Sequence, residues 1–507
     1  ITQGDTFYKA KGKESVKQMS KLVKNYIYNL SYQIFVIIVP LITMPYLARV
    51  LRADNIGIYS YVTSCASIIN TVGLLGLYNY GNRQIAYTRD NKETLNNTFN
   101  ELMSIRIILC IIATILYIVW ALLSEYTIYF IIYYPWLLTG FVDISWFFAG
   151  IEDMGPMVLK NFLIKVLNII CIFIFVKKEE DLGIYFALVA IITLLANLSM
   201  YLQLKNKHLQ FRFTLHKSRN HIISAILLFL PQLASLFYLQ VDKVMLKCFS
   251  DTTSQVAFYD QAEKIVNIPF SVVTALSIVM MPRIANEFKK GNMDSINEYI
   301  FKSARFAMMI SIPIFFGLDA IADKFIPWYL GDEYLPVIQA IWIISPIIIT
   351  NTLVNISGTQ YLTAINQTKI LTISNVIAAM INFIVNLLLI PSLGFYGAAI
   401  ATVFSSIFCV AIQFFWMNKT IKIRLLMLKM WKYWISAFFM FIIIRLLIVP
   451  KTATPINTFM AIFIGAGIYF ITLLIFKDEL IFNICHVIKG LGRKFNANKK
   501  IVLYIRY

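Results

Sequence analysis

Seven ionisable side chains lie inside long apolar stretches of this sequence, where a charge is unfavourable. Five are cationic and two are acidic: Arg106, Asp143, Lys165, Asp242, Lys243, Arg305 and Arg445. On insertion scales, a charge at the centre of a membrane-spanning helix costs about 2.5 to 3.5 kcal/mol, so such residues usually face a bundle interior or a watery cavity. The excess of cations predicts an interior that attracts anions, because Arg and Lys bind phosphate and carboxylate groups.

Lys165 is the most informative of these cations. It lies about eight residues, or roughly 12 Å, into a predicted helix over residues 157–176, which is too deep for its ammonium to reach the interface easily. A cation at that depth predicts an anionic partner. Two alternatives follow, contact with an anionic substrate or a structural ion pair with Asp143.

The other intramembrane charges allow both functional and structural interpretations. Asp242 and Lys243 are adjacent, so their side chains point about 100° apart on a helix; one could bind substrate while the other bridges helices, or both could lie at the interface. Arg106 and Arg305 occupy equivalent places near the cytoplasmic ends of two predicted helices, where snorkelling anchors are the favoured interpretation. Arg445 is expected to be an anchor.

Three further arginines complete the predicted cationic site. Arg49 follows the first predicted helix on the outer side, where the positive-inside rule disfavours arginine and a specific use is expected. Arg83 and Arg283 belong to an internal repeat. The candidates for binding an anionic substrate are therefore Lys165, Lys243, Arg49, Arg83, Arg283, Arg106 and Arg305, with Asp143 and Asp242 as supporting or ion-coupling acids.

The sequence predicts no catalytic residues, metal site or cofactor, although coupling to an ion of unknown identity stays open. The six cysteines are scattered without a CxxC spacing, and the four histidines form no HExxH pattern. The segments expected outside are short, the longest running roughly from 319 to 336. An extracytoplasmic catalytic domain is therefore not expected, and the protein is predicted not to be an enzyme.

Composition indicates which elements must position these residues. The 507 residues are 59% hydrophobic and 14% charged, with mean hydropathy +0.71. A soluble domain has about 25% charged residues, so most of this chain is expected to lie in lipid. We predict an all-α integral membrane protein with about fourteen spanning helices, near 26–48, 56–78, 102–122, 126–148, 157–176, 182–203, 222–246, 264–283, 302–323, 336–358, 370–391, 396–417, 431–449 and 457–476.

The distribution of basic residues predicts the orientation. About 32 of the 45 Lys and Arg residues fall in tails and loops that this topology places inside. Both termini are therefore expected in the cytoplasm. The N-terminal segment is expected to remain uncleaved. The net charge of +19 comes mostly from these inner loops. In a membrane protein such loops contact anionic lipid headgroups, and a nucleic-acid partner is not expected.

An internal repeat is visible in the sequence. Tyr59 and Tyr259 are each followed by an arginine 24 residues later, Arg83 and Arg283, and LGIY at 182–185 matches LGFY at 393–396. The matches predict two parallel six-helix repeats with the substrate path between them. The predicted parts are a cytoplasmic segment 1–25, an N-lobe 26–210, a C-lobe 211–425, two added helices in 426–480 and a basic cytoplasmic tail 481–507.

Several longer strings resemble a known family. They are PLITMPYLARVLRADNIGIYSY (40–61), LGLYNYGNRQIAYTRD (75–90), LQVDKVML (239–246), AFYDQAEKIVNIP (257–269), MPRIANEF (281–288), SGTQYLTAINQTK (357–369) and NLLLIPSLGFYGAAIAT (386–402). In order and spacing, over about residues 25–480, the chain resembles bacterial polysaccharide-repeat-unit flippases of the Wzx type, in the multidrug/oligosaccharidyl-lipid/polysaccharide exporter superfamily. It departs from them at Arg52-Ala53-Asp54, where the family more often has a glycine-containing turn.

This resemblance implies a fold and a function. It implies V-shaped lobes around a cationic cavity in a multi-pass protein of the bacterial cytoplasmic membrane. The implied activity is translocation of an undecaprenyl-diphosphate-linked oligosaccharide from the inner to the outer leaflet, for capsule, O-antigen or exopolysaccharide synthesis. The expected partners are membrane lipids, this lipid-linked oligosaccharide and possible polymerase and chain-length machinery.

Three alternatives are open at this stage. A cation-coupled multidrug exporter of the same superfamily would be expected to have acidic cavity residues, whereas cations dominate here. A membrane polymerase, ligase or glycosyltransferase would be expected to have a large outer loop with paired carboxylates or histidines. A passive scramblase is compatible with the same sequence features.

Overall fold

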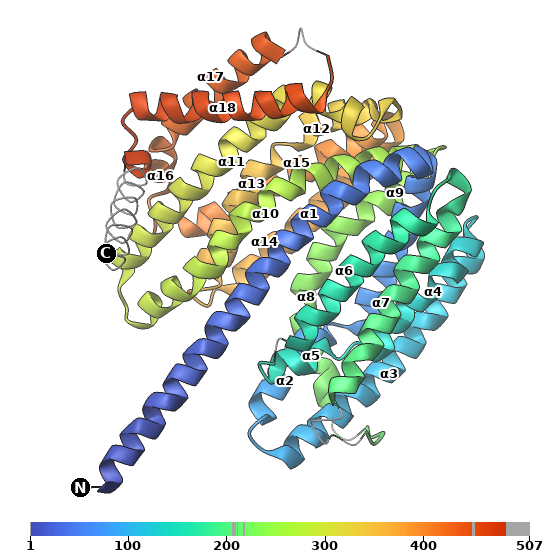
Figure 1. Ribbon diagram of the computed structural model, residues 1–507, viewed down its shortest axis with the longest axis vertical. Helices are drawn as coiled ribbons and strands as arrows, with labels where there is room; N and C mark the ends of the chain where they lie inside the picture. The colour runs from blue at the N-terminus through green and yellow to red at the C-terminus, as the bar shows by residue number, and fades with distance from the viewer. Residues whose placement is uncertain are drawn as a thin grey trace, which may run out of the picture. The chain divides into compact units, whose positions relative to one another are not determined.

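Every regular element in the computed structural model is helical (Figure 1). The structure describes residues 2–482 apart from 154, 205–208, 210, 216, 217 and 449–451. Side chains are described from residue 38 onward, with further gaps within 218–238 and 272–279 and at 448. No strand occurs in these described residues. The predicted all-α membrane class is confirmed. The side chains of the predicted segment 1–25 and the tail from residue 483 onward lie outside the described residues.

The chain divides into two compact units between Ala257 and Phe258. In the first unit, α4 and α6 both pack against α7, α1 packs against α3, and α2 against α5. Its helices are α1 (Thr2–Leu74), α2 (Leu77–Thr88), α3 (Lys92–Leu123), α4 (Thr127–Val142), α5 (Ser145–Gly150), α6 (Gly155–Phe175), η1 (Glu179–Asp181), α7 (Leu182–Leu204), α8 (Ser218–Leu236), η3 (Phe237–Val241) and α9 (Asp242–Phe249).

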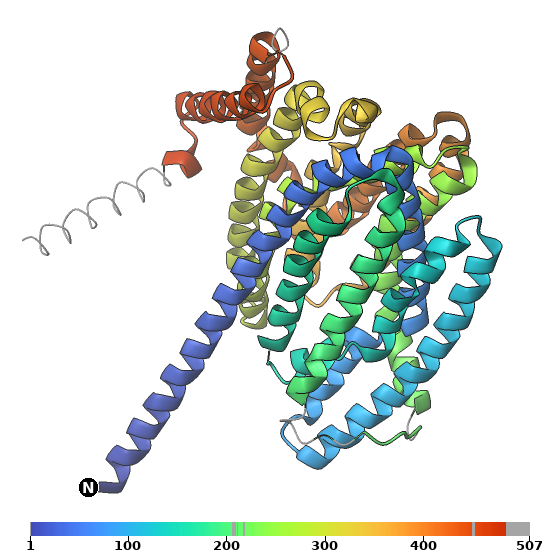
Figure 2. The ribbon, with the colours of Figure 1, turned by 45° about the vertical axis from the view of Figure 1, so that its right-hand side comes forward.

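The second unit is built around the pairs α14 with α15, α11 with α17, and α17 with α18, the last of which lie side by side in both ribbon views (Figure 2). Its elements are α10 (Ser254–Lys289), α11 (Met293–Tyr329), η4 (Asp332–Tyr334), α12 (Pro336–Ile344), α13 (Ile347–Val354), η5 (Asn355–Leu362), α14 (Thr368–Leu393), α15 (Phe395–Met417), α16 (Ile423–Leu428), α17 (Trp431–Ile448) and α18 (Pro455–Ile475).

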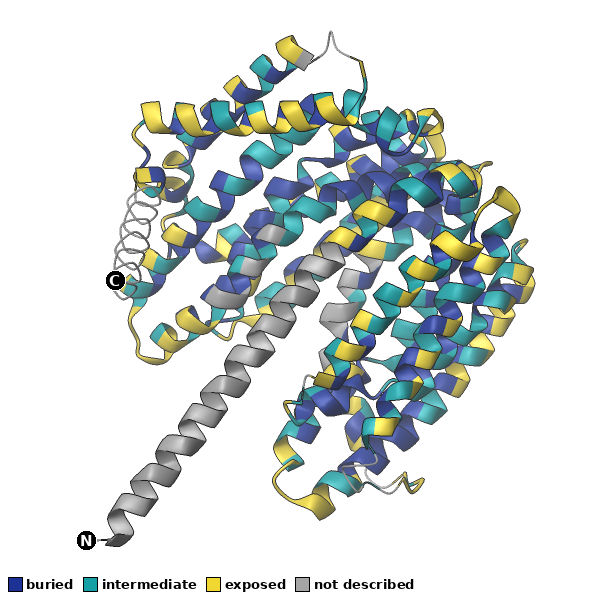
Figure 3. Ribbon diagram, in the orientation of Figure 1, coloured by how far each residue is buried: buried dark blue, intermediate teal, exposed yellow. Residues whose placement is uncertain are grey.

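Large apolar side chains on the outer faces of the helices are exposed, as lipid-facing residues of a membrane protein are. Along α18, Phe459 and Phe463 are 55% and 76% exposed, and Ile471 and Ile475 are 58% and 69% exposed (Figure 3). Each pair is four residues apart, so the side chains lie on one helical face. In water such a stripe would be unfavourable, whereas hydrocarbon accepts it.

Ten helices of the described residues are long and apolar enough to cross a membrane. They coincide with ten of the fourteen predicted spans, from 102–122 through 182–203 and from 302–323 through 457–476. The other four predicted spans fall on α1, on α8 to α9, and on α10. Fourteen spans and two six-helix repeats remain predictions, as do the lobe boundaries near residues 210 and 425.

The predicted connection between the first two spans is a break within α1 rather than a loop. Arg52 has φ 63° and ψ 175°, which interrupts the helical backbone. A non-glycine residue is strained at positive φ, which agrees with the glycine expected in this turn from the family resemblance. Two contacts with η1 hold the break: Arg52 Nε lies 3.6 Å from the Glu179 carboxylate, and Asn55 donates to the Glu179 carbonyl at 3.0 Å.

Candidate functional site

A break between α4 and α5 creates the polar centre of the first unit. Asp143 ends α4, and its Oδ1 accepts a hydrogen bond at 3.0 Å from the backbone N–H of Ser145, the first residue of α5. The first N–H groups of a helix have no partner within the helix, so a carboxylate there both caps α5 and interacts favourably with its dipole. Local backbone chemistry therefore fixes Asp143 in place.

Lys160 of α6 is the ion-pair partner of Asp143. Its Nζ lies 3.3 Å from Asp143 Oδ1, 2.6 Å from Ser145 Oγ and 3.1 Å from Asn197 Oδ1 of α7. The Lys160 side chain is 9% exposed. All three ammonium protons thus have acceptors, and a single side chain ties together α5, α6 and α7.

Arg106 of α3 brings a second cation to this region. It is 3% exposed, and its Nε donates to the carbonyl of Gly140 in α4. Its charge also attracts the Asp143 carboxylate. Burial is incompatible with a snorkelling anchor. Among the described residues its Nη1 is buried without a hydrogen-bond acceptor.

Two cations facing one carboxylate give this cluster an excess positive charge. We name Arg106, Asp143, Ser145, Lys160 and Asn197 the cationic cluster. A buried donor without an acceptor is unfavourable, by about 1 to 3 kcal/mol or more for a charged group. The cluster is therefore suited to accept an oxygen of an anion at Arg106.

Lys165 does not pair with Asp143. It lies on α6, is partly exposed, and makes no hydrogen bond or ion pair with any side chain that the structure describes. Lys160 and Lys165 are five positions apart, so at 100° per residue their side chains point about 140° apart. The structural ion pair between Lys165 and Asp143 is therefore not formed. Contact of Lys165 with an anionic substrate stays a prediction.

Sequence reasoning missed Lys160 and a second buried network. His221 of α8 lies 2.9 Å from the Glu101 carboxylate of α3 through Nε2 and 2.7 Å from the Tyr80 hydroxyl of α2 through Nδ1. Lys160 lies inside predicted span 157–176, and its place near the end of that span concealed it. Glu101 and His221 each fall one residue outside a predicted span, so a window widened by one turn would have included both.

The same side of α3 also binds the backbone that leads into α8. Asn100 Oδ1 accepts from the N–H of Arg212 at 3.2 Å, and Ser104 Oγ accepts from the N–H of Thr214 at 2.9 Å. Glu101 lies between these two residues on α3 and reaches His221. Helix α3 therefore binds both the backbone at Arg212 and Thr214, which precedes α8, and His221 near the start of α8.

The remaining predicted site residues lie elsewhere. Asp242 and Lys243 are both buried in α9, after the π-helical turn η3, and both have interaction partners. Arg49, Arg83 and Arg283 are exposed, and Arg83 lies over the Tyr80 ring at 5.8 Å from its centroid. The cationic cluster thus includes only Arg106 and Asp143 of the predicted set.

The two arginines expected as anchors in the second unit form ion pairs. Arg305 donates to Glu479 at 2.8 Å and to Asp478 at 3.2 Å. Its guanidinium holds the pKa of the exposed Glu479 below the usual value, chiefly through that hydrogen bond. Arg445 pairs with Asp323 at 2.9 Å. No group of three metal-ligating side chains occurs in the part of the chain that the structure describes.

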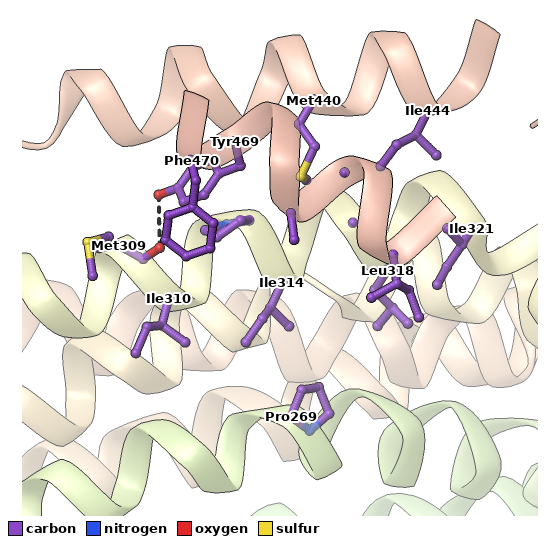
Figure 4. A pocket seen from close by; sticks show the side chains of 15 residues that line it. Pro269, Met309, Ile310, Ile314, Leu318, Ile321, Met440, Ile444, Tyr469 and Phe470 are labelled. Carbon is purple, nitrogen blue, oxygen red and sulfur yellow. Dashed lines mark hydrogen bonds between the residues drawn. The ribbon is translucent and has the colours of Figure 1, made fainter. Parts of the chain in front are cut away.

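The second unit contains an apolar pocket between α10, α11, α17 and α18 (Figure 4). Its volume is about 450 Å³, and its lining includes Ile314, Leu318, Met440, Ile444 and Phe470. The Tyr469 hydroxyl at its edge donates to the carbonyl of Met309 at 2.8 Å. The pocket is therefore suited to hydrocarbon rather than to a polar ligand.

The described residues thus form an all-helical membrane fold with a cationic cluster in the first unit and an apolar pocket in the second. The model of the family described as "Polysaccharide biosynthesis protein" matches residues 22–288, just over half of the chain. This chain belongs to that family. The resemblance drawn from the sequence is thereby confirmed.

Individual relatives and a solved structure agree with this assignment. A putative O-antigen transporter of Escherichia coli K12 is 24% identical over 338 residues, 66% of this chain and 81% of that protein. The probable low-salt glycan biosynthesis flippase Agl15 of Haloferax volcanii is 28% identical over 169 residues, 33% of this chain and only 35% of the relative. A structure of the lipid II flippase MurJ in an inward closed conformation superposes with TM-score 0.73 at 17% identity, covering 90% of this chain and all of that one. That structural likeness shows the fold.

Proposed function

We propose that this protein translocates undecaprenyl-diphosphate-linked oligosaccharide repeat units from the inner to the outer leaflet of the bacterial cytoplasmic membrane by alternating access. The product would serve capsule, O-antigen or exopolysaccharide synthesis. Family membership and the names of the relatives support the coarser statement, that this is a flippase of lipid-linked saccharide precursors. Both termini would lie in the cytoplasm, and a polymerase and chain-length machinery would use the product.

The observation that carries the proposal is the buried, unpaired Nη1 of Arg106 beside the Lys160–Asp143 pair. A diphosphate oxygen would supply the missing acceptor, and a charge-assisted hydrogen bond in a poorly hydrated interior is about twice as strong as a neutral one. Lys165, partly exposed and without a carboxylate partner among the described residues, is a second candidate donor. Lys160 and Asp143 would keep α5, α6 and α7 in position rather than bind the substrate.

The apolar pocket of the second unit favours a substrate with a lipid part. Its lining is hydrocarbon, which a polyprenyl chain matches without desolvating any polar group. A cation-coupled exporter of cationic drugs is disfavoured, because a positively charged interior repels such cargo.

The test is a clean deletion in a host that has no second flippase, complemented with wild type or with Arg106→Ala. We expect deletion to abolish surface polymer and to leave repeat units accessible only from the inner leaflet. Arg106→Ala should accumulate in the membrane yet restore little polymer, while Arg424→Ala, at an exposed arginine outside the predicted site, serves as the matched control. Normal surface polymer in the deletion strain would contradict the proposal, and unchanged polymer with greater drug sensitivity would favour multidrug export.

A further inference from the structure

A partly buried carboxyl group, whose Oδ1 atom is fully enclosed, lies beside a buried hydroxyl group in the second unit. Asp319 is on α11, and Ser345 occupies the break between α12 and α13, next to the Asp319 side chain. Ser345 is fully buried. Asp319 Oδ1 and Ser345 Oγ are both buried without a hydrogen-bond partner among the described residues. The Ser345 hydroxyl can donate to an ionised Asp319 carboxylate or accept from a protonated one, so the surroundings of the carboxyl group decide which form is favoured.

The surroundings disfavour a negative charge on Asp319. Its neighbours Gly317, Leu318 and Ile321 line the apolar pocket. The charged groups closest along these helices are Asp323, one turn further along α11, and Arg445 of α17, and these two pair with each other at 2.9 Å. Arg445, the cation of α17, therefore pairs with Asp323. An ionised carboxylate next to hydrocarbon and without a cation is strongly disfavoured relative to its neutral form.

The backbone around Asp319 is fixed to α12. The indole N–H of Trp342 donates to the carbonyl of Asp319 at 3.1 Å, and the Arg445 guanidinium lies over the Trp342 ring at 6.0 Å from its centroid. α12 and α11 are thus joined at this point by a neutral hydrogen bond. The carboxyl group of Asp319 stays next to the helix break regardless of its charge.

The geometry points to a proton-binding site formed by Asp319 and Ser345. One proton adds to the Asp319 carboxylate, and the resulting O–H donates to Ser345 Oγ, which removes the charge and keeps the contact between the two side chains. The ligand is the proton, taken from water and released to water, and no other bond changes. This proton site deepens the proposed function. Only the use of the proton as the coupling ion rests on that function.

Proton occupancy would also bias the packing of these helices. With the proton bound, the neutral side chain favours the closed contact of α11 with α12 next to the apolar pocket. After its release, the charge favours an arrangement that admits water to Asp319. A site of this kind can couple a proton gradient to a change between two conformations, because it binds the proton more tightly in one of them.

The test measures proton binding directly, by infrared difference spectroscopy of the purified full chain in lipid nanodiscs, titrated from about pH 5 to about pH 9. We expect a protonated carboxyl band at neutral pH in wild type that Asp319→Asn removes and Asp319→Glu retains. The matched control is Asp323→Asn, one turn away on the same helix, which should keep the band. Ser345→Ala should shift the frequency of the band, because the neutral carboxyl loses its hydrogen-bond acceptor.

A wild-type protein without this band at neutral pH would overturn the proposal, and so would a band that persists in Asp319→Asn protein. Monodisperse elution of the Asp319→Asn protein would show that misfolding is not the cause of the loss of the band. The measurement needs no substrate, so it can fail while flipping is normal, and it can succeed while flipping is absent.

Discussion

The interiors of the two units are polar in different ways. In the first unit, charged side chains meet: Lys160 with Asp143, Arg106 beside them, and Glu101 with His221. In the second unit, the centre around the π-helical segment η5 is built from hydroxyls and amides. Gln360 accepts from Ser303 at 2.5 Å and donates to Ser277 at 2.7 Å.

More neutral bonds continue this pattern in the second unit. Ser357 donates to Gln413 at 2.6 Å, and Ser311 and Thr352 lie 2.7 Å apart. Two of its ion pairs join separate helices or segments: Arg305 pairs with Asp478 near the end of the described chain, and Arg445 of α17 pairs with Asp323 of α11. The helices around η5 are thus joined mainly through uncharged groups, whereas the buried carboxylates of this unit, Asp260, Glu263 and Asp478, lie elsewhere.

This difference shows where binding energy for a substrate can reside. Neutral hydrogen bonds between helices in lipid contribute about 0.6 kcal/mol on average, enough to align helices without a large desolvation penalty. Buried charges are much more unfavourable to desolvate, so a unit that contains them needs compensating partners. Under the proposed function, the neutral groups around η5 would act as a framework and the charges of the first unit would contact the anion.

Removing Lys160 should have the largest effect on folding. Lys160→Ala leaves the partly buried Asp143 with only Arg106 nearby and takes the ammonium donor from Ser145 and Asn197, which is expected to lower the free energy of unfolding by about 3 kcal/mol. Combining it with Asp143→Asn should recover much of the loss. Thermal unfolding in detergent, followed by fluorescence, would measure both variants. A double variant no more stable than Lys160→Ala would show that the pair is not coupled.

Breaking the second charged network should have a smaller effect. His221→Ala removes the link between α8 and both α2 and α3, and it leaves the buried Glu101 without a donor, at about 1 to 3 kcal/mol. Tyr80→Phe, which removes only one neutral hydrogen bond, should lose about 0.5 to 1.5 kcal/mol. The same unfolding measurement applies. Equal losses in the two variants would mean that Glu101 does not depend on His221.

A neutral network in the second unit should respond more weakly still. Gln360→Leu keeps the approximate volume but removes the bonds to Ser303 and Ser277, and about 0.6 to 1.7 kcal/mol is expected from interhelical hydrogen bonds in membranes. Transport by this variant should stay close to wild type. A loss of stability as large as that of Lys160→Ala would remove the distinction between framework and charged unit.

The smallest change in stability is expected at Lys165, with a large change in transport. Because Lys165 has no ion-pair partner among the described residues, Lys165→Ala should alter the free energy of unfolding by no more than about 0.5 kcal/mol. Transport should fall severely, and Lys165→Arg should retain part of it, since charge survives while geometry changes. Normal flipping by well-folded Lys165→Ala protein would exclude this residue from the substrate site.

The sequence by itself determined the helical membrane class, the places of ten apolar helices and the interruption near Arg52. These properties depend on residues that are close together in the sequence. A helix forms its backbone hydrogen bonds within itself, and its hydrophobicity is the sum over consecutive residues. The presence of costly charges at Arg106 and Asp143 was readable for the same reason.

Tertiary structure decided which charges meet. Lys160 and Lys165 belong to one helix and one predicted span, and only the packing of α6 against α5 and α7 determines that Lys160 is the lysine that reaches Asp143. Glu101 and His221 are 120 positions apart in the chain. A charge is a property of one residue, but its partner depends on the rotation of each helix about its axis, and that rotation is set by long-range packing.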